Sequence, residues 1–402
     1  MRIIELEEEQ ATEIPKAALR EDWALQLSRK YGKLIQVEFP GPHNDRRYIL
    51  RPRSCVGQIL LGDYLLNIRS KVGVENVFGM LEYGYQLALL ETGNRLVDCK
   101  SISEIFERLA SILARKVLER AHRGLLRDYV EREGELPYLR GRLIGDHLRI
   151  HNTPNRLNCR FQDHTTNLLE NRILAWTLYC LRLMPLQSSV VKSQIRQAFR
   201  AIAGTVELKR ISPEECMEPI YNSLNMEYRP MHALCRFFLE QCGPGLGKGG
   251  SAYLPVVVNM PLLFERFVAA WLVEYVPRGL KIKSQHRAQL EGSEKLAFQI
   301  DMVLVEEQTG EPLAVLDTKY KTANRPEEDD IKQVLSYAVR MGTEKAFLIY
   351  PTAEMGSFTV KVGAIEIHSI SFDIARNLQE AGCIFLENLL ENISFSPITN
   401  IM

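Results

Sequence analysis

LAFQIDMVLVE (296–306) and PLAVLDTKYK (312–321) are two short, largely apolar segments. Their side chains alternate between apolar and polar or are β-branched. Between them lies EQTGEP (307–312), where Gly310 is free to take a positive φ and reverse the chain. Alternation over this length is typical of β-strands, and the run LAVL is apolar enough for a central strand. We therefore predict an antiparallel strand pair inside a C-terminal α/β domain.

Three charged residues interrupt these strands: Asp301 in the first, and Asp317 and Lys319 in the second. Side chains at i and i+2 of a strand point to the same face, so Asp317 and Lys319 should lie together. Two acids and a lysine at neighbouring strand centres are hard to explain by folding alone. Two carboxylates can bind a hard cation such as Mg²⁺, and a protonated lysine beside them can stabilise the charge of a reacting phosphate. This pattern predicts a metal-assisted hydrolysis.

A helix is predicted on each side of the strand pair. PLLFERFVAAWLVEYV (261–276) begins with a proline and is apolar nearly all round, so it should be buried. Glu265 within it is either a third metal ligand or part of a narrow exposed stripe. After the strands, PEEDDIKQVLSYAVRMG (326–342) has an acidic first turn and a terminal glycine. Its Gln333 and Tyr337 are four residues apart and share one face.

By pattern, the chain divides into three regions and a linker, which predicts an α+β multidomain fold. Residues 1–100 predict a β-rich N-terminal domain, including two strands joined around Gly62 and Asp63 in CVGQILLGDYLLNIRSKV (55–72). Helical spacing predicts a mainly helical middle region. The middle region spans 101–242, a Gly-rich linker spans 243–252, and the C-terminal domain with the strand pair spans 253–402. The linker should allow two folded units to be separated.

The glycines of the linker do not predict a nucleotide site. Gly245, Gly247 and Gly250 have the spacing of a dinucleotide fingerprint, but a helix rather than a strand precedes them. The phosphate-loop pattern fails as well, because Cys242 and Gly249 occupy positions that require Gly and Ser or Thr. Any nucleotide-driven motion should therefore come from a partner.

Composition narrows the class of protein further. The 402 residues are 46% hydrophobic and 25% charged, with no apolar run long enough for a membrane span and no secretion signal at the start. No two of the eight cysteines form a CxxC pair, so we expect free thiols in a reducing cytoplasm rather than a zinc or iron–sulfur site. Residues 101–210 carry 19 basic and 11 acidic side chains, whereas 211–402 carry 17 and 25. The basic segment either faces phosphates or an acidic partner, or forms solvated helix faces.

The ordered set Glu265, Asp301, Asp317-x-Lys319 and Gln333-x-x-x-Tyr337 resembles the PD-(D/E)XK nuclease superfamily, and its last pair resembles the RecB-type branch. Ile300 stands where the proline of the motif is expected, a replacement that the superfamily tolerates. The resemblance implies a mixed central sheet flanked by helices. It also implies catalytic roles for all six residues, with Asp301, Asp317 and Glu265 as ligands of Mg²⁺.

A narrower resemblance covers most of the chain. Four segments are similar to the McrC family, the nuclease subunits of McrBC modification-dependent restriction systems: LLNIRSKVGVENVFGMLEYGY (65–85), DHTTNLLENRILAWTL (163–178), MPLLFERFV (260–268) and LDTKYK (316–321). This implies a cytoplasmic anti-phage endonuclease that cuts double-stranded DNA with McrB, a GTP-driven AAA+ motor, and joins larger complexes through it. It also implies that the N-terminal region docks on McrB and stimulates its GTPase. In the basic middle region, Arg140 and Arg142 are candidates for the residue that stimulates the GTPase.

Two other functions remain open. A stand-alone PD-(D/E)XK nuclease would need no motor, and a non-enzymatic adaptor would keep the fold for interaction only. The presence of the full set of catalytic-type residues counts against the adaptor. The acidic C-terminal half favours an enzyme that a partner delivers to DNA, because such a surface attracts phosphates poorly.

Overall fold

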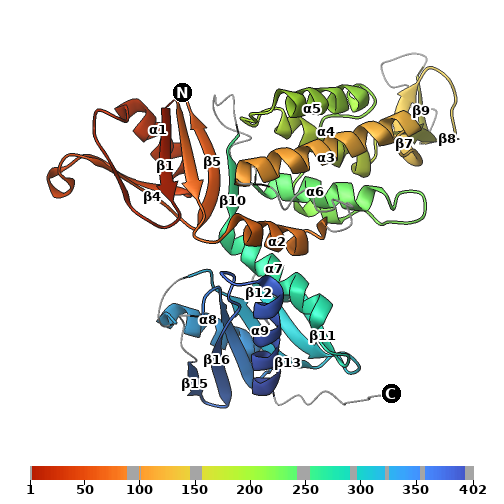
Figure 1. Cartoon of the computed structure of the whole chain (residues 1–402). Coiled ribbons are helices and arrows are strands. Elements are labelled where there is room, and N and C mark those ends of the chain that lie inside the picture. Colours follow the sequence, from red (N-terminus) through yellow and green to blue (C-terminus); the bar gives the residue numbers. More distant parts are fainter. Residues whose placement is uncertain are drawn as a thin grey trace. The chain divides into compact units, whose positions relative to one another are not determined.

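The structure is a computed structural model, shown in Figure 1. It describes residues 2–87, 99, 101–144, 156–241, 254–289, 297–321, 326–353 and 358–393, without the side chains of 285–289 and 297–298. Two compact units result: one joins the described residues up to Phe106 with those from Pro255 onward, and the other holds those from Glu107 to Leu254. The linker predicted at 243–252 lies outside the described residues. The three-domain division stays a prediction, although contacts group its first and last regions in one unit.

The first unit contains a four-stranded sheet assembled from both ends of the chain. Its strands, in spatial order, are β1 (Arg2–Glu7), β6 (Tyr64–Arg69), β5 (Cys55–Leu61) and β10 (Val256–Asn259). The predicted hairpin between β5 and β6 is confirmed, and Gly62 in its turn has a φ of 58°. Strand β10 pairs antiparallel with β5, so a strand from the expected nuclease domain completes the N-terminal sheet.

The N-terminal region also contains a three-stranded sheet, in agreement with its predicted β-rich character. Its order is β2 (Thr12–Ile14), β4 (Tyr48–Pro52) and β3 (Ile35–Glu38), with a 3-10 turn at Pro42–Asn44. Helix α1 (Glu21–Tyr31) was not predicted, and it packs Ala24 and Leu27 into the core that both sheets share.

A six-stranded sheet forms the rest of the first unit. Its spatial order is β11 (Leu280–Gln289), β12 (Ala297–Glu306), β13 (Pro312–Thr318), β14 (Lys345–Tyr350), β16 (Ile365–Ser371) and β15 (Thr359–Val362). The predicted antiparallel pair is β12 and β13, and β13 is central because β14 pairs with it in parallel on the other side. Strand β11 was not predicted.

Helices cover this sheet and connect it to the N-terminal region. They are α2 (Val74–Gly84), α7 (Met260–Tyr275), α8 (Glu328–Met341) and α9 (Leu378–Ile393). Helix α8 buries Val334 and Ala338 against the sheet, and the predicted terminal Gly342 ends it with a φ of 70°. Helices α2 and α7 contact each other, and their Tyr83 and Tyr275 hydroxyls lie 3.1 Å apart.

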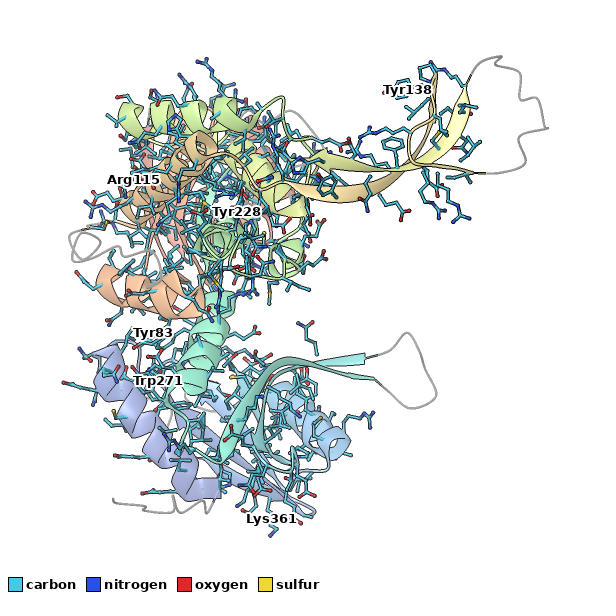
Figure 2. The ribbon with its side chains drawn as sticks, turned by 90° about the vertical axis from the view of Figure 1, so that its right-hand side faces the viewer. Tyr83, Arg115, Tyr138, Tyr228, Trp271 and Lys361 are labelled. Carbon is cyan, nitrogen blue, oxygen red and sulfur yellow. The ribbon has the colours of Figure 1, made fainter. Side chains whose placement is uncertain are left out.

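The second unit is a group of helices that carries a β-arm. The helices are α3 (Ile102–Arg123, of which the unit includes Glu107 onward), α4 (Leu169–Leu181), α5 (Ser189–Ile202) and α6 (Tyr228–Gln241), with a 3-10 turn at Glu214–Met217. The arm is a sheet of β7 (Asp128–Leu136), β9 (Leu157–Thr165) and β8 (Arg142–Leu143), in that order. Figure 2 shows it projecting from the helices, with Tyr138 near its far end. The middle region, predicted to be mainly helical, thus has four helices among its described residues but also contains the strands of this arm.

A buried polar cluster holds the base of this arm. The Asn171 amide donates to the carbonyl oxygens of Leu126 at 2.9 Å and Thr166 at 2.7 Å, one before β7 and one after β9. The Tyr228 hydroxyl donates to Asn171 Oδ1 at 2.8 Å and accepts from the Leu126 N–H at 2.9 Å. Both ends of the arm are therefore tied to α4 and α6.

Composition also led to expectations about membrane spans and cysteines. No helix in the described ranges is long and apolar enough to cross a membrane. Within the same ranges, seven cysteines are free thiols, and all but Cys383 are buried.

Candidate active site

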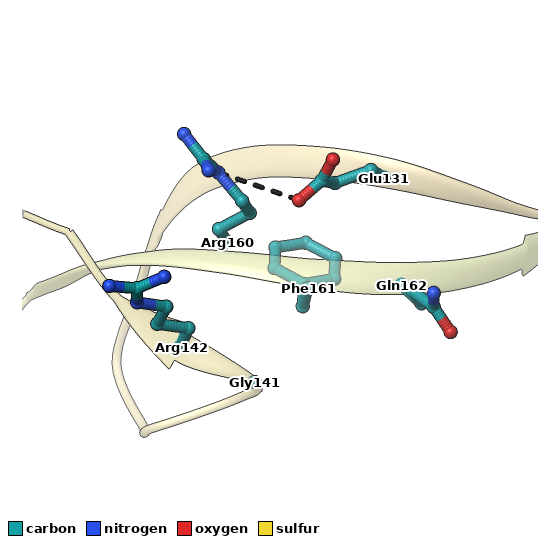
Figure 3. A pocket seen from close by; sticks show the side chains of 6 residues that line it. All are labelled: Glu131, Gly141, Arg142, Arg160, Phe161 and Gln162. Atoms are coloured by element: carbon teal, nitrogen blue, oxygen red, sulfur yellow. Dashed lines mark ion pairs between the residues drawn. The ribbon is translucent and has the colours of Figure 1, made fainter.

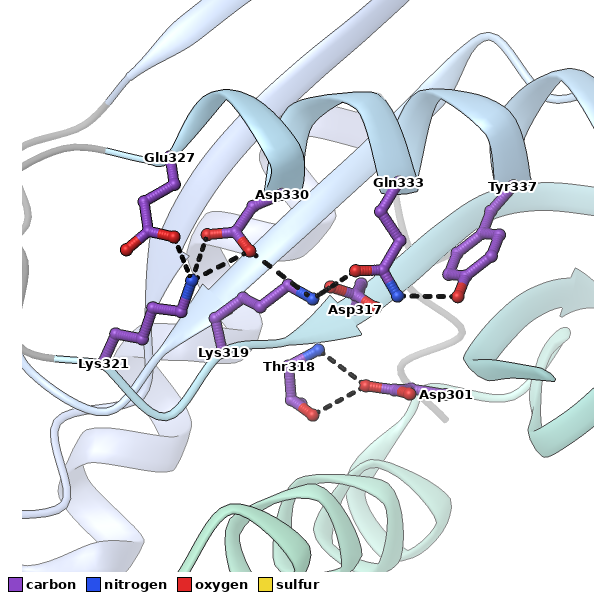
Figure 4. Close-up of polar contacts among 9 residues, drawn as sticks. All are labelled: Asp301, Asp317, Thr318, Lys319, Lys321, Glu327, Asp330, Gln333 and Tyr337. Carbon is purple, nitrogen blue, oxygen red and sulfur yellow. Dashed lines mark hydrogen bonds and ion pairs between the residues drawn. The ribbon is translucent and has the colours of Figure 1, made fainter. Parts of the chain in front are cut away.

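Asp301 and Asp317 lie on adjacent antiparallel strands. Met302 of β12 pairs with Leu316 of β13. Asp301 directly precedes Met302, and Asp317 directly follows Leu316. Because strand side chains alternate, both acids share the face of Val303 and Val315, which pack with α8. Alternation in the sequence had predicted only that Asp317 and Lys319 lie together, and Figure 4 shows the two carboxylates beneath α8.

Thr318 orients the first carboxylate. Its backbone N–H donates to Asp301 Oδ2 at 2.9 Å, and its hydroxyl donates to the same oxygen at 2.8 Å. Two donors on one oxygen restrict the rotation of the carboxyl group. The side chain of Asp301 is thus positioned by the residue that follows Asp317.

Asp317 is a buried carboxylate with incomplete compensation. It is 1% exposed, and its Oδ2 lies 2.7 Å from Lys319 Nζ in an ion pair that lacks the alignment of a hydrogen bond. The pKa of Asp317 is raised to about 7: burial is the largest cause, the nearby charge of Asp301 adds to it, and Lys319 opposes both. Lys319 therefore compensates the charge of the buried Asp317 carboxylate only in part.

Lys319, Gln333 and Tyr337 form a chain of side-chain contacts above the acids. Strand β13 ends at Thr318, and the Lys319 N–H donates to the Ile349 carbonyl at 2.8 Å. Lys319 Nζ donates to Gln333 Oε1 at 2.8 Å, and Gln333 Nε2 donates to the Tyr337 hydroxyl at 2.7 Å. The structure thus brings five of the six predicted residues into one cluster (Figure 4).

Glu265 is the sixth predicted residue. It lies on α7, which contacts β12 and β13, and it is half-buried rather than buried. In the described ranges, no group of three or more His, Cys, Asp or Glu side chains could hold a metal ion. The role of Glu265 as a third ligand therefore stays a prediction.

Asp330 and Lys321 belong to the same cluster and were not predicted. Asp330, in the first turn of α8, is 5% exposed, and its oxygens lie 3.1 and 3.2 Å from Lys321 Nζ. Lys321 also contacts the exposed Glu327 at 2.7 Å. In the sequence, the acidic first turn was interpreted only through the helix dipole. The spacing 330, 333 and 337 places all three residues on one helix face, but Asp329 also lies four residues before Gln333, so spacing alone does not single out Asp330.

A cavity of about 410 Å³ lies on the arm of the second unit. Its lining residues are Glu131, Gly141, Arg142, Arg160, Phe161 and Gln162, shown in Figure 3. Arg140 lies beside it, with its guanidinium 4.4 Å from the Phe161 ring centre and its Nη2 3.2 Å from Asp163 Oδ1. The two arginines named from the sequence are therefore both on the arm.

Comparison with known proteins gives a consistent result. The model of the family described as McrBC 5-methylcytosine restriction system component matches residues 50–351, more than half of the chain. The type IV methyl-directed restriction enzyme EcoKMcrBC of Escherichia coli (strain K12) is 24% identical over 292 residues, which are 68% of this chain and 77% of that protein. The predicted resemblance to the McrC family is thereby confirmed.

A solved structure with a TM-score above 0.5 agrees with the fold. A refined half-complex from the tetradecameric assembly of Thermococcus gammatolerans McrB AAA+ hexamers with bound McrC contains a chain that matches with a TM-score of 0.52 and 18% identity. The match covers 97% of this chain and all of the other. The cryo-EM structure of the Thermococcus gammatolerans McrBC complex matches with a TM-score of 0.41 and 20% identity, over 67% of this chain and 87% of that one.

Proposed function

Because the chain belongs to the family of McrBC 5-methylcytosine restriction system components, we propose that it is the Mg²⁺-dependent endonuclease subunit of such a system. It hydrolyses phosphodiester bonds of double-stranded DNA together with an McrB-type AAA+ GTPase. One observation carries the proposal: Asp301 and Asp317 share a face of the sheet with Lys319 beside them. Carboxylate pairs of this kind serve metal-assisted phosphoryl hydrolysis.

The chemistry of the acid pair fits a hard divalent cation. Carboxylate oxygens are the ligands that Mg²⁺ prefers. The raised pKa of Asp317 has burial as its first cause and the charge of Asp301 as its second, and a cation beside both acids removes the cost of each. Asp301 and Asp317 would hold the ion, with Glu265 as a further candidate. When bound, Mg²⁺ supplies polarisation of the phosphate and acidification of a coordinated water.

The other residues of the cluster act through position and charge. The Lys319 ammonium stabilises negative charge on the phosphate oxygens as the bond breaks. Gln333 fixes that ammonium through its Oε1, and Tyr337 fixes the Gln333 amide in turn. Thr318 keeps the Asp301 carboxylate in one orientation. This division of roles requires no proton transfer by Lys319.

A nucleotide-driven partner accounts for the rest of the chain. The solved structure with the same fold comes from an assembly of McrB AAA+ hexamers with bound McrC, and we carry that partner over to this chain as part of the proposal. The N-terminal and middle regions dock on the partner and stimulate its GTP hydrolysis. Arg140 and Arg142 on the β-arm are the candidates for that contact, because arginines can stabilise the charge of a transferring phosphoryl group.

The test is a cutting assay with the full chain, the McrB-type partner, GTP, Mg²⁺ and 5-methylcytosine-containing plasmid. Asp317→Asn keeps the shape of the side chain and removes a ligand charge, so cutting is expected to fall below detection. The matched control is Asp329→Asn, since Asp329 is 92% exposed on α8 and carries the same change. Wild-type cutting by the Asp317→Asn variant would refute the assignment.

The same assay separates the two other functions. Strong cutting by the wild-type chain without a partner or GTP would favour a stand-alone nuclease. No cutting by the wild-type chain under any of these conditions, together with normal partner binding, would favour a non-enzymatic adaptor.

A further inference from the structure

Two lysines follow the end of β13, and one buried acid on α8 lies close to both. Lys319 Nζ is 3.7 Å from Asp330 Oδ1, while Lys321 Nζ is 3.2 Å from that oxygen and 3.1 Å from Oδ2. Figure 4 shows Asp330 above the two ammonium groups, between Glu327 and Gln333. Asp330 is therefore the point at which the first turn of α8 meets the end of β13.

The distances divide the work between the two lysines. Lys321 makes the close two-oxygen contact and neutralises the buried Asp330 carboxylate, which would otherwise be costly. Lys319 lies farther from the Asp330 carboxylate, at 3.7 Å, and makes its short contacts with Asp317 and Gln333. An unpaired Asp330 would compete for the Lys319 ammonium and draw it away from Asp317.

We propose that Asp330, neutralised by Lys321, is a positioning residue that fixes the Lys319 ammonium over the Asp301–Asp317 pair. This inference rests on the proposed nuclease function and adds a support to its site. Asp330 touches neither the phosphate nor the metal ligands by this account, and it acts through Lys319. Because a displacement of about 1 Å at a reacting centre can cost about 10²-fold in rate, such a support has a measurable effect.

The alternative is that Asp330 only fastens α8 to the sheet. A fastening role predicts a lower melting temperature and an unchanged rate for the folded protein. A positioning role predicts a slower chemical step at saturating DNA, with the apparent KM for DNA unchanged, because Asp330 itself contacts no DNA. The two roles therefore differ in the split between kcat and KM.

The experiment compares Asp330→Asn with Asp329→Asn in the full chain with its partner. Both changes remove one carboxylate charge from the same helix turn, but Asp329 is 92% exposed and pairs only loosely with Lys332, at 3.6 Å. Plasmid cutting is measured at saturating Mg²⁺ and GTP over a range of DNA concentrations. We expect Asp330→Asn to lower kcat by about 10- to 100-fold with KM within about twofold, and Asp329→Asn to match the wild type.

Thermal melting of each variant accompanies the kinetics. If Asp330→Asn melts early, the double variant Asp330→Asn with Lys321→Met removes both charges of the buried pair and should show the same low kcat. Wild-type kcat in a folded Asp330→Asn or double variant overturns the inference. A wild-type chain that does not cut DNA overturns the proposed function instead, so the two failures are distinguishable.

Discussion

His232 makes the stability of the second unit depend on pH. Its side chain lies on α6 and is 1% exposed. Nε2 lies 3.0 Å from the Glu170 carbonyl oxygen, which can only accept, so Nε2 carries the proton. Nδ1 then accepts from the Tyr221 hydroxyl at 2.8 Å. The fold therefore selects one neutral tautomer.

The magnitude follows from the pKa. Burial lowers the pKa of His232 from 6.5 to about 4, and the bond to the Glu170 carbonyl only partly opposes it. Between these two values the unfolded chain binds more protons than the folded one, so stability rises with pH. The contribution is fully present above pH 6.5 and is lost as pH falls toward 4. With about 1.4 kcal/mol for each pH unit of difference, its full size is about 3 kcal/mol.

The assay is chemical unfolding of the wild type and of His232→Gln at several pH values from 4 to 7.5. Glutamine keeps an amide donor for the Glu170 carbonyl and does not titrate. The free energy of unfolding of the variant should therefore fall less steeply on acidification than that of the wild type. We expect the wild type to lose about 3 kcal/mol more than the variant over this range. The control is His122→Gln, because His122 is exposed in the last turn of α3.

Two results would contradict this reasoning. One is an equal pH dependence of the free energy of unfolding in the wild type and His232→Gln. The other is a His232 ring that titrates near 6.5 in the folded protein by NMR, because the burial that lowers the pKa would then be absent.

Three further changes have expected outcomes. Lys319→Ala should slow cutting by about 10²- to 10³-fold while calorimetry still detects Mg²⁺ binding; lost binding with persistent cutting would contradict the assigned role. Tyr228→Phe removes the acceptor of the Leu126 N–H at the base of the arm, so chemical unfolding should show a loss of about 2 kcal/mol. Gly62→Ala should lower the free energy of unfolding by about 2 kcal/mol, because φ is +58° and the new Cβ would lie 2.1 Å from the Trp23 ring. Wild-type stability of Tyr228→Phe would show that its hydrogen bond is dispensable, and wild-type stability of Gly62→Ala would show that the turn accepts a side chain.

The candidate site was predictable where its signals are local. Strand alternation predicted that Asp317 lies with Lys319, beside Asp301 of the neighbouring strand. Helical spacing placed Gln333 and Tyr337 on one helix face, and the resemblance to the PD-(D/E)XK superfamily assigned that pair to the site. Both periodicities are properties of a few consecutive residues, so they survive in the sequence alone. The same reasoning placed β12, β13 and α8 at nearly their observed limits.

Asp330 shows why the rest of the site was missed. It stands beside Glu328 and Asp329, and in the sequence the three acids of this turn are equivalent. The structure separates them, because Asp330 is 5% exposed whereas the side chains of Glu328 and Asp329 are 83% and 92% exposed. Burial depends on how α8 sits on the sheet, and no spacing within the helix specifies it. The helix dipole explained the whole acidic turn equally well and concealed the difference.

Strand β7 was missed for a different reason. Its sequence DYVEREGEL is exposed almost throughout, so it carries no alternation between an apolar and a polar face. Its regular structure comes from nine pairs with β9, a strand that follows later in the sequence. A strand without a buried face leaves hardly any signal for periodicity to detect.

Because β10 pairs with β5, the chain cannot be divided at the predicted linker into two independent units. Composition predicted that the chain can be divided at 243–252, but Val256–Asn259 completes the N-terminal sheet and Asn259 then caps α7. Asn76 of α2 also donates to the carbonyl oxygens of Ile374 and Arg376, both at 3.0 Å. A cut at the linker would strip a strand from the sheet and separate these partners, so neither half keeps its native contacts. Partner docking and DNA cutting are therefore properties to assign by point substitutions in the intact chain rather than by fragments.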